Sequence, residues 1–197
     1  MGNRPALLVL DLINEIADPA GKYGAEGFAQ QIADRKVLEN AAKAVEGART
    51  AGIPVIHVVV GFSPGHPEWP ATSPVFAAAK ADDRLVFGTW ATQVHPALTP
   101  AVGEPVISKS RISPFYGTGL DVLLRTQGVD TLLVTGVSTD MVILATARDA
   151  HDRDYVVEVL EDATAADNQE IHQAALKVIA RTATITTVER ALSRHAQ

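Results

Sequence analysis

The chain has no cysteine among its 197 residues. This absence excludes disulfide bonds, thiolate metal ligands and any reaction through a cysteine nucleophile. Positive charge is also scarce, because 17 lysines and arginines stand against 23 acidic residues, for a net charge of -6. Since no cluster of basic residues is available to neutralise a row of phosphates, we predict that nucleic acid is not a partner.

Long apolar runs and glycine-rich phosphate-binding motifs are missing as well. The first apolar run, Ala6 to Leu10, is too short for a signal peptide and is closed by Asp11. No run approaches the roughly 20 residues that span a bilayer. We therefore predict a cytoplasmic protein with no membrane partner and, in the absence of a nucleotide-binding fingerprint, no cofactor.

Short apolar runs recur along the chain, and helical patterns or turn residues follow them. Runs without polar alternation are typical of strands buried on both faces, as in a parallel sheet covered by helices. The predicted strands are Ala6 to Leu10, Pro54 to Val60, Pro105 to Ile107, Thr131 to Thr135, Tyr155 to Leu160 and Thr184 to Val188. The length and the 47% hydrophobic content predict one domain over residues 1–197.

Helical patterns alternate with these strands. They cover about Ala29 to Ala51, Leu120 to Gln127, Thr139 to Arg153 and Asn168 to Ala180. The order predicts a three-layer α/β/α sandwich with a central parallel sheet and right-handed crossovers, a Rossmann-like arrangement. In such sheets ligands bind beyond the carboxyl ends of the strands.

The segment from Gly61 to Pro105 breaks this alternation. It is rich in proline and glycine and carries both tryptophans. A connection of this length predicts either a functional lid or a contact between subunits. Its apolar and aromatic residues favour a homo-oligomer, a dimer or larger.

Three predicted strand ends carry polar groups. Asp11 directly follows the first strand, and Lys109 follows the third. An ammonium beside a carboxylate lowers the pKa of the carboxyl group and holds it in place, or it binds an anionic substrate. The alternatives are that Asp11 caps the next segment and that Lys109 is merely solvated.

The third strand end is the turn Gly136 to Val142, which opens a predicted helix. The first N–H groups of a helix have no partner within it, so Ser138 and Thr139 stand where an oxyanion or carboxylate is held. The alternative is that Ser138, Thr139 or Asp140 caps the helix. Both interpretations are compatible.

Taken in order, these segments resemble the isochorismatase-like hydrolases, a family that includes nicotinamidases, N-carbamoylsarcosine amidases and true isochorismatases. The resemblance covers nearly the whole chain. The strings that carry it are Leu8 to Asn14, Lys109 to Leu120, Gly136 to Thr139, Thr146 to Ala150 and Glu161 to Ala163.

The resemblance implies an Asp, a Lys and a Cys at the active site. Asp11 and Lys109 take the first two roles, but the cysteine position falls on Val142, which offers no nucleophile. Ile13 also stands where many members have a glutamine. The resemblance further implies a cis peptide between Val137 and Ser138.

Four further residues are predicted to bind the substrate. Arg111 would hold a substrate carboxylate together with Lys109, and Trp90 would roof the pocket or else belong to a core or an interface. Phe115, in the string after Lys109, and Thr139, beside Ser138, complete the set.

True isochorismatases also lack the cysteine and split a vinyl ether, which needs a proton donor and water. The resemblance therefore implies a hydrolase acting on a small carboxylated metabolite, with Asp11 as the general acid. Its pKa would be raised by burial and lowered by Lys109. Against this, those enzymes have a glycine at the position of Val142.

Two alternatives remain open. One is an altered family member that binds a small molecule, and the other is an amidohydrolase whose cysteine was replaced at Val142. Metal-binding relatives place an Asp and two histidines after the second strand. Here His57 lies inside that strand and His66 has no convincing partner, so we predict no metal and structural roles for both.

Overall fold

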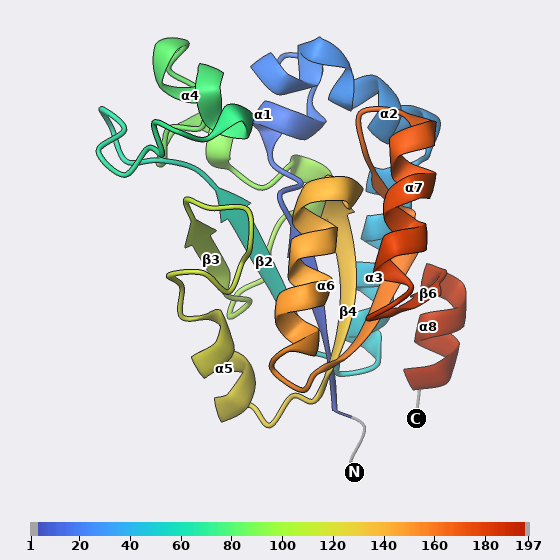
Figure 1. Cartoon of the computed structure of the whole chain (residues 1–197). Coiled ribbons are helices and arrows are strands. Elements are labelled where there is room, and N and C mark those ends of the chain that lie inside the picture. The colour runs from blue at the N-terminus through green and yellow to red at the C-terminus, as the bar shows by residue number, and fades with distance from the viewer. Residues whose placement is uncertain (1–3, 196–197) are drawn as a thin grey trace.

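The computed structural model of the protein describes residues 4–195, which form a six-stranded, wholly parallel sheet between layers of helices (Figure 1). The strand order is β3-β2-β1-β4-β5-β6. The strands are β1 (Pro5–Leu10), β2 (Val55–Val60), β3 (Val106–Lys109), β4 (Thr131–Val137), β5 (Val156–Ala165) and β6 (Thr184–Thr186). The predicted fold class is confirmed.

The central strands are buried on both faces because helices cover both sides of the sheet. Along β1, Leu8 and Leu10 belong to one apolar cluster, whereas Leu7 and Val9 belong to another on the opposite face. Side chains alternate between the faces of a strand, so an unbroken apolar run fills two cores at once.

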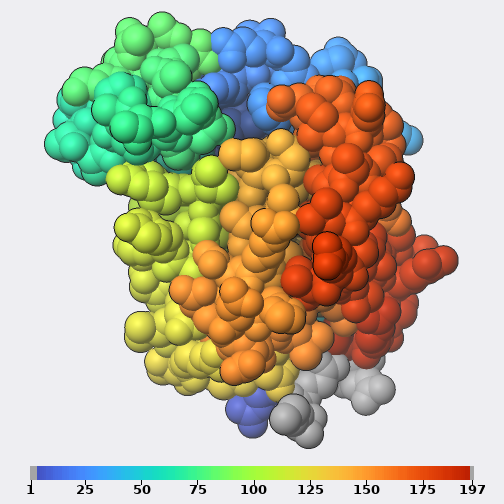
Figure 2. Space-filling model, in the orientation of Figure 1, coloured from blue at the N-terminus to red at the C-terminus, as the bar shows by residue number. Residues whose placement is uncertain are grey.

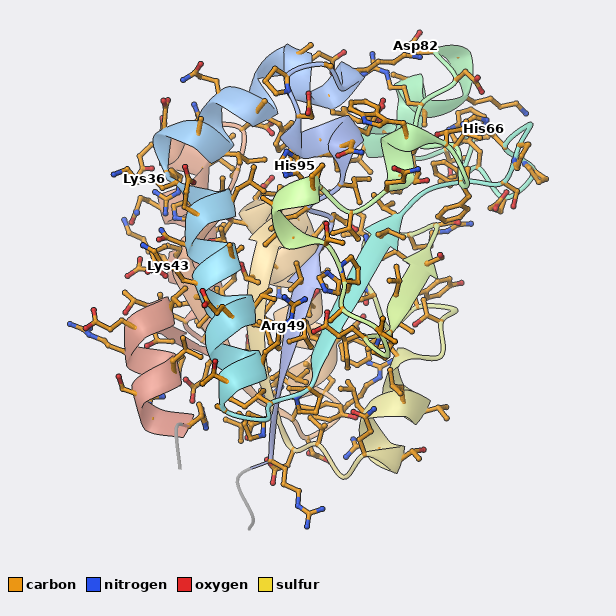
Figure 3. The ribbon with its side chains drawn as sticks, turned by 180° about the vertical axis from the view of Figure 1, so that it is seen from behind. Lys36, Lys43, Arg49, His66, Asp82 and His95 are labelled. Carbon is orange, nitrogen blue, oxygen red and sulfur yellow. The ribbon has the colours of Figure 1, made fainter. Side chains whose placement is uncertain are left out.

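The helices divide between these two cores. Helices α5, α6 and α7 cover the first face, and α3 and α8 cover the second (Figures 1 and 3). Their bounds are α3 (Val37–Thr50), α5 (Leu120–Thr126), α6 (Leu144–His151), α7 (Gln169–Ile179) and α8 (Val188–His195). No helix among residues 4–195 is both long and apolar enough to cross a membrane.

One predicted helix and one predicted strand need correction. The predicted helix from Ala29 to Ala51 is divided into α2 (Ala29–Asp34) and α3, because Lys36 has a left-handed backbone with a φ of 55°. At the other end of the chain, Val188 begins helix α8 rather than ending a strand. Val188, Ala191 and His195 are its buried residues, and this spacing places them on one helix face.

Residues 61–92 form a lobe at the carboxyl end of the sheet, beside the residues that follow β1 (green beside blue in Figure 2). The lobe contains the short helices η2 (Pro74–Phe76), α4 (Ala77–Ala81) and η3 (Trp90–Thr92). The following helix η4 (Pro96–Leu98) packs against α3, and Glu104 bonds to Arg49 there. Phe62, Phe76 and Leu85 form a small apolar cluster that holds the lobe together. Figure 3 shows His66 and Asp82 in this lobe, far from Arg49 on α3.

Candidate active site

Asp11 lies immediately after β1, where the strand delivers its next side chain beyond the sheet. Its backbone has a φ of 54°, and its N–H donates a hydrogen bond of 2.9 Å to the carbonyl of Val58. The side chain is almost fully buried, with 1% of the residue exposed. A carboxylate so placed is costly unless it is paired.

Lys109 supplies the partner from the end of β3. Because β1 and β3 flank β2 in a parallel sheet, their carboxyl ends meet at the same edge. The Nζ atom of Lys109 lies 2.7 Å from Asp11 Oδ2 and donates a second hydrogen bond of 3.0 Å to the carbonyl of Arg111. The distance to Asp11 lies well inside the 6 Å or so over which a direct pair acts.

Burial raises the pKa of the Asp11 carboxyl group above its usual value. The charge and hydrogen bond of Lys109 lower it, as does, more weakly, the backbone N–H of Val60, but burial dominates. Asp11 Oδ1 has no hydrogen-bond partner of normal geometry among the described residues. This oxygen can therefore accept a further hydrogen bond from a ligand.

The turn after β4 forms the wall opposite the lobe. The Val137–Ser138 peptide is cis, as the resemblance implies. The chain continues into a π-helical turn, η5 (Thr139–Ile143), in which the carbonyl of Ser138 accepts hydrogen bonds of 2.9 Å and 3.0 Å from the N–H groups of Val142 and Ile143. This turn leads directly into α6.

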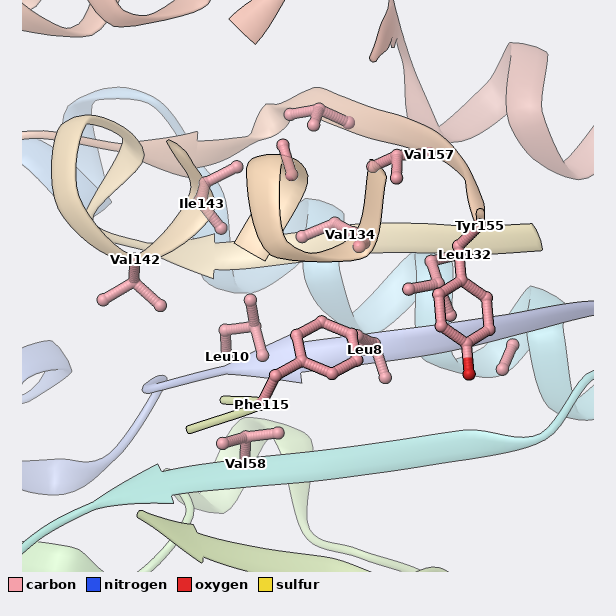
Figure 4. Close-up of a cluster of buried hydrophobic side chains, with 14 of the residues drawn as sticks. Leu8, Leu10, Val58, Phe115, Leu132, Val134, Val142, Ile143, Tyr155 and Val157 are labelled. Carbon is pink, nitrogen blue, oxygen red and sulfur yellow. The ribbon is translucent and has the colours of Figure 1, made fainter. Parts of the chain in front are cut away.

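Val142 lies in the wall of the pocket that also exposes Asp11 and Lys109. It is 9% exposed, and Figure 4 shows its side chain at the end of an apolar cluster, near Leu10. Its carbonyl accepts a hydrogen bond of 2.6 Å from Thr146 Oγ1. The position that resemblance assigns to the nucleophile is therefore at the pocket but chemically inert.

The pocket itself has a volume of about 520 Å³, ample for a small metabolite. Its wall is mostly apolar, with a few convergent polar groups. It is lined by Asp11, Ile16, Tyr23, Phe28, Val60, Ser73, Pro74, Val75, Phe76, Leu85, Lys109, Ile112, Val137, Ser138, Asp140, Met141, Val142 and Asp167. The lobe supplies Ser73 to Phe76 and Leu85, as the lid interpretation of residues 61–105 requires.

Four of the residues predicted to bind substrate do not line this pocket. Trp90 is 45% exposed on η3, and the guanidinium of Arg111 donates hydrogen bonds to the carbonyls of Glu68 and Ser110. Phe115 is a core residue whose ring lies 6.1 Å from that of Tyr155. Thr139 is fully buried, with Oγ1 2.8 Å from His172 Nδ1.

The sequence analysis missed several lining residues that lie outside the predicted strands and helices. Tyr23 and Phe28 come from the segment between β1 and α2, which includes the π-helical turn η1 (Gly24–Phe28), and Asp167 comes from the connection after β5. These segments show no clear period, so no pattern in them indicated which side chains turn inward. Asp167 stands four residues beyond the Glu161 to Ala163 string, which was its only nearby signal.

His57 and His66 are engaged in other contacts. His57 Nε2 lies 3.3 Å from Glu104 Oε2, at the end of the sheet away from the pocket. His66 Nε2 lies 2.9 Å from the carbonyl of Arg84, within the lobe. Among residues 4–195, no three His, Cys, Asp or Glu side chains are grouped so that they could hold a metal ion.

Comparison with known proteins assigns the class. The Isochorismatase domain family model matches residues 5–190, nearly the whole chain. The protein belongs to the isochorismatase family of hydrolases.

Two curated relatives are ureidoacrylate amidohydrolases RutB. That of Methylobacterium radiotolerans is 36% identical over 183 residues, covering 86% of this chain and 70% of the relative. That of Yersinia enterocolitica is 33% identical over 171 residues, covering 81% and 74%. These similarities are to enzymes that cleave amides.

Solved structures give the same fold. An isochorismatase family protein from Desulfovibrio vulgaris matches with a TM-score of 0.87 at 29% identity, covering 100% of both chains. The N-carbamoylsarcosine amidase of Thermoplasma acidophilum matches with a TM-score of 0.74 at 28% identity, covering 94% of this chain and 97% of that one.

Proposed function

We propose that this protein binds a small amide-containing molecule in the pocket of Asp11, Lys109 and Val142, as a family member in which the covalent route to amide hydrolysis is closed. The observation that carries the proposal is the position of Val142. An isopropyl group stands in the wall that also holds a paired carboxylate and ammonium. Without a nucleophile at this point, no thioester forms.

The named relatives support an amide as the ligand. They are a ureidoacrylate amidohydrolase and an N-carbamoylsarcosine amidase, both named for amide-type substrates. They favour this interpretation over the cleavage of a vinyl ether, which the sequence alone suggested. An amide also suits the pair: its N–H groups would donate to Asp11 Oδ1, and its carbonyl would accept from Lys109.

A second candidate, hydrolysis without a covalent intermediate, is favoured by the state of Asp11. Burial raises the pKa of this carboxyl group, and among residues 4–195 its Oδ1 has no hydrogen-bond partner of normal geometry. A carboxylic acid tuned in this way can transfer a proton at moderate pH. Vinyl-ether cleavage with Asp11 as the general acid remains the reaction of this kind that the family resemblance implies.

Binding and turnover can be measured on the same panel. The wild-type protein is incubated with nicotinamide, ureidoacrylate, other small amides and isochorismate, and binding is followed by calorimetry and product by mass spectrometry. The proposal expects saturable binding of an amide without product. The Asp11→Asn variant should bind it more weakly, because an amide group replaces the carboxylate that accepts the ligand's N–H groups.

Two results would contradict the proposal. Failure of every amide to bind would reject the ligand class. Turnover by the wild type that disappears in Asp11→Asn would instead establish the second candidate.

A further inference from the structure

The pocket has two chemically different parts. Its charged lining residues lie at strand ends or shortly after them, and they are Asp11, Lys109, Asp140 and Asp167. The other part comes from residues 14–28 and from the lobe, both of which lie beyond the strand ends (Figure 1). Among the described residues this outer wall contributes no charged group to the lining; it contributes Ile16, Tyr23, Phe28, Ser73, Pro74, Val75, Phe76 and Leu85. A ligand that fills the pocket therefore meets a polar floor and a mostly apolar outer wall.

Phe76 gives the outer wall a fixed aromatic surface. Its ring packs edge-on against that of Phe62, with 5.4 Å between the ring centroids and 88° between the ring planes. Its carbonyl accepts a hydrogen bond of 2.7 Å from Trp69 Nε1. Because packing already holds this side chain in place, it can cover an apolar group of a ligand at little cost in conformational entropy.

Leu85 lines the same wall from an unusual backbone conformation. Its φ of 58° lies in the left-handed region, which favours glycine and is rare for leucine. The carbonyl of Leu85 accepts a hydrogen bond of 2.8 Å from the N–H of Phe62, and the N–H of Phe87 donates one of 2.8 Å to the carbonyl of Phe62. Such strain persists where the surrounding structure enforces it, and it is most frequent at ligand sites. Its effect here is to place an aliphatic side chain in the lining.

Val75 and Phe28 continue the apolar wall outward. Val75, on η2, is 42% exposed, and Phe28, at the end of η1, is also partly exposed. A single exposed apolar side chain is ordinary, but these two line one cavity. A ligand that covers them removes apolar surface from water, which favours binding.

The volume of the pocket also exceeds what an amide group needs. Cavities of roughly 300–1,000 Å³ accommodate drug-sized ligands, and this pocket has a volume of about 520 Å³. An amide held by Asp11 and Lys109 occupies the floor alone. The rest of the ligand then extends toward the lobe and residues 14–28.

We infer that the ligand is an amphipathic amide, with a carboxamide head on Asp11 and Lys109 and an uncharged alkyl or aryl chain against the outer wall. Phe28, Val75 and the neighbouring apolar residues of that wall determine the specificity for the chain. This inference rests on the proposed function for the amide head and adds the chemical class of the remainder.

A homologous series of amides tests the inference. Acetamide, butanamide and hexanamide share one carboxamide and differ only in chain length, whereas 5-hydroxypentanamide has the length of hexanamide and ends in a hydroxyl group. Calorimetric titration of the wild-type protein, with competition against hexanamide for the weak binders, should show about threefold to fourfold tighter binding for each added methylene. Hexanamide should bind about tenfold more tightly than 5-hydroxypentanamide, because a hydroxyl group is costly to bury against an apolar wall.

A double variant locates the binding of the chain. Phe28→Ser with Val75→Ser places hydroxyl groups on the partly exposed side of the wall and should reduce the preference for hexanamide over 5-hydroxypentanamide to less than about threefold. The matched control is Val122→Ser with Val156→Ser, which changes two valines that are 71% and 58% exposed and do not line the pocket. The control should keep the full preference.

The outcomes separate the two claims. If no amide of the series binds, the proposed function fails. If the amides bind regardless of chain length, or if 5-hydroxypentanamide binds as tightly as hexanamide, the amide site stands and the inference about the chain is wrong. The inference is also wrong if the Phe28 and Val75 changes weaken hexanamide and 5-hydroxypentanamide equally, or if the control variant loses the preference as well.

Discussion

The ammonium of Lys109 lies 2.7 Å from the carboxylate of Asp11, although 98 positions separate the two residues in the chain. Both side chains are almost inaccessible, with 1% and 2% of their surface exposed. Burying either charge without its partner would strongly destabilise the folded protein. The ion pair is therefore what allows both side chains to be buried. The pair follows from the sheet order, which brings the ends of β1 and β3 to either side of β2.

Replacing one member of this ion pair should lower the free energy of unfolding more than replacing both. Lys109→Met leaves an uncompensated carboxylate and should lower the free energy of unfolding by about 3–5 kcal/mol, as measured by urea denaturation. The double variant with Asp11→Asn should regain a large part of that loss, although neither variant would bind ligand normally. A double variant no more stable than Lys109→Met would show that the pair is not energetically coupled.

His172 should make the protein less stable in mild acid. It is fully buried on α7, and burial, assisted by the charge of Arg35, lowers its pKa to about 4. The unfolded chain takes up this proton near pH 6.5, so the stabilisation is complete above that pH and is lost as the pH falls toward 4. The loss should reach roughly 1–3 kcal/mol.

The test compares the pH dependence of unfolding in His172→Gln with that of the wild type. The free energy of unfolding of His172→Gln should change less between pH 6.5 and 4 than that of the wild type. His151→Gln, which changes an exposed histidine on α6, should show the same pH dependence as the wild type. Parallel curves for the wild type and His172→Gln would rule out this role.

Gly136 should resist substitution because of where β4 passes β1. Its φ is 126°, and a Cβ atom built on it would lie 2.0 Å from the carbonyl oxygen of Leu10, next to Asp11. Gly136→Ala should cost roughly 3 kcal/mol or more in thermal or urea unfolding. Gly103→Ala is the control, since it shares a positive φ but has no atoms within 4 Å of the added Cβ. Its cost should stay near 1–2 kcal/mol, and equal losses in both variants would exclude the steric explanation.

The sequence prediction of an oligomer also needs a direct test. Val75 and Trp90, both in the lobe, are 42% and 45% exposed. Light scattering at micromolar concentration should give the mass of a dimer or larger, and Trp90→Ser should shift it toward the monomer. Val122→Ser, which changes an equally apolar but separate position on α5, should not. A monomeric wild type would refute the prediction.

The site residues that could be predicted are those attached to strands. Asp11 and Val142 come after the buried strands β1 and β4, and Lys109 ends the more exposed strand β3. A parallel sheet brings such strand ends together whatever the loops do. Residues whose place depends on the path of an irregular segment gave no such signal. Tyr23 turns into the pocket and Trp90 does not, yet nothing periodic distinguishes their surroundings.

Phe115 shows a further limit. The string around it pointed to the site, but its ring packs on Tyr155, 40 positions later in the chain by number, and so belongs to the core. Arg111 was expected to face a substrate, but the carbonyls of Glu68 and Ser110 capture its guanidinium. Local sequence identifies a group capable of binding, whereas its competing partners come from the tertiary structure.

The central claim is that the pocket remains shaped for an amide and lacks only a nucleophile. The most direct test is Val142→Cys, with product formation from the amide that the wild type binds followed by mass spectrometry. Val142→Ala is the control, because it opens the same wall without supplying a thiol. The account predicts that the cysteine variant alone forms product, that a thiol reagent abolishes this activity, and that Asp11→Asn abolishes it too. If Val142→Cys binds the amide as well as the wild type does and still forms no product, the pocket is not arranged for acyl transfer and the account is wrong.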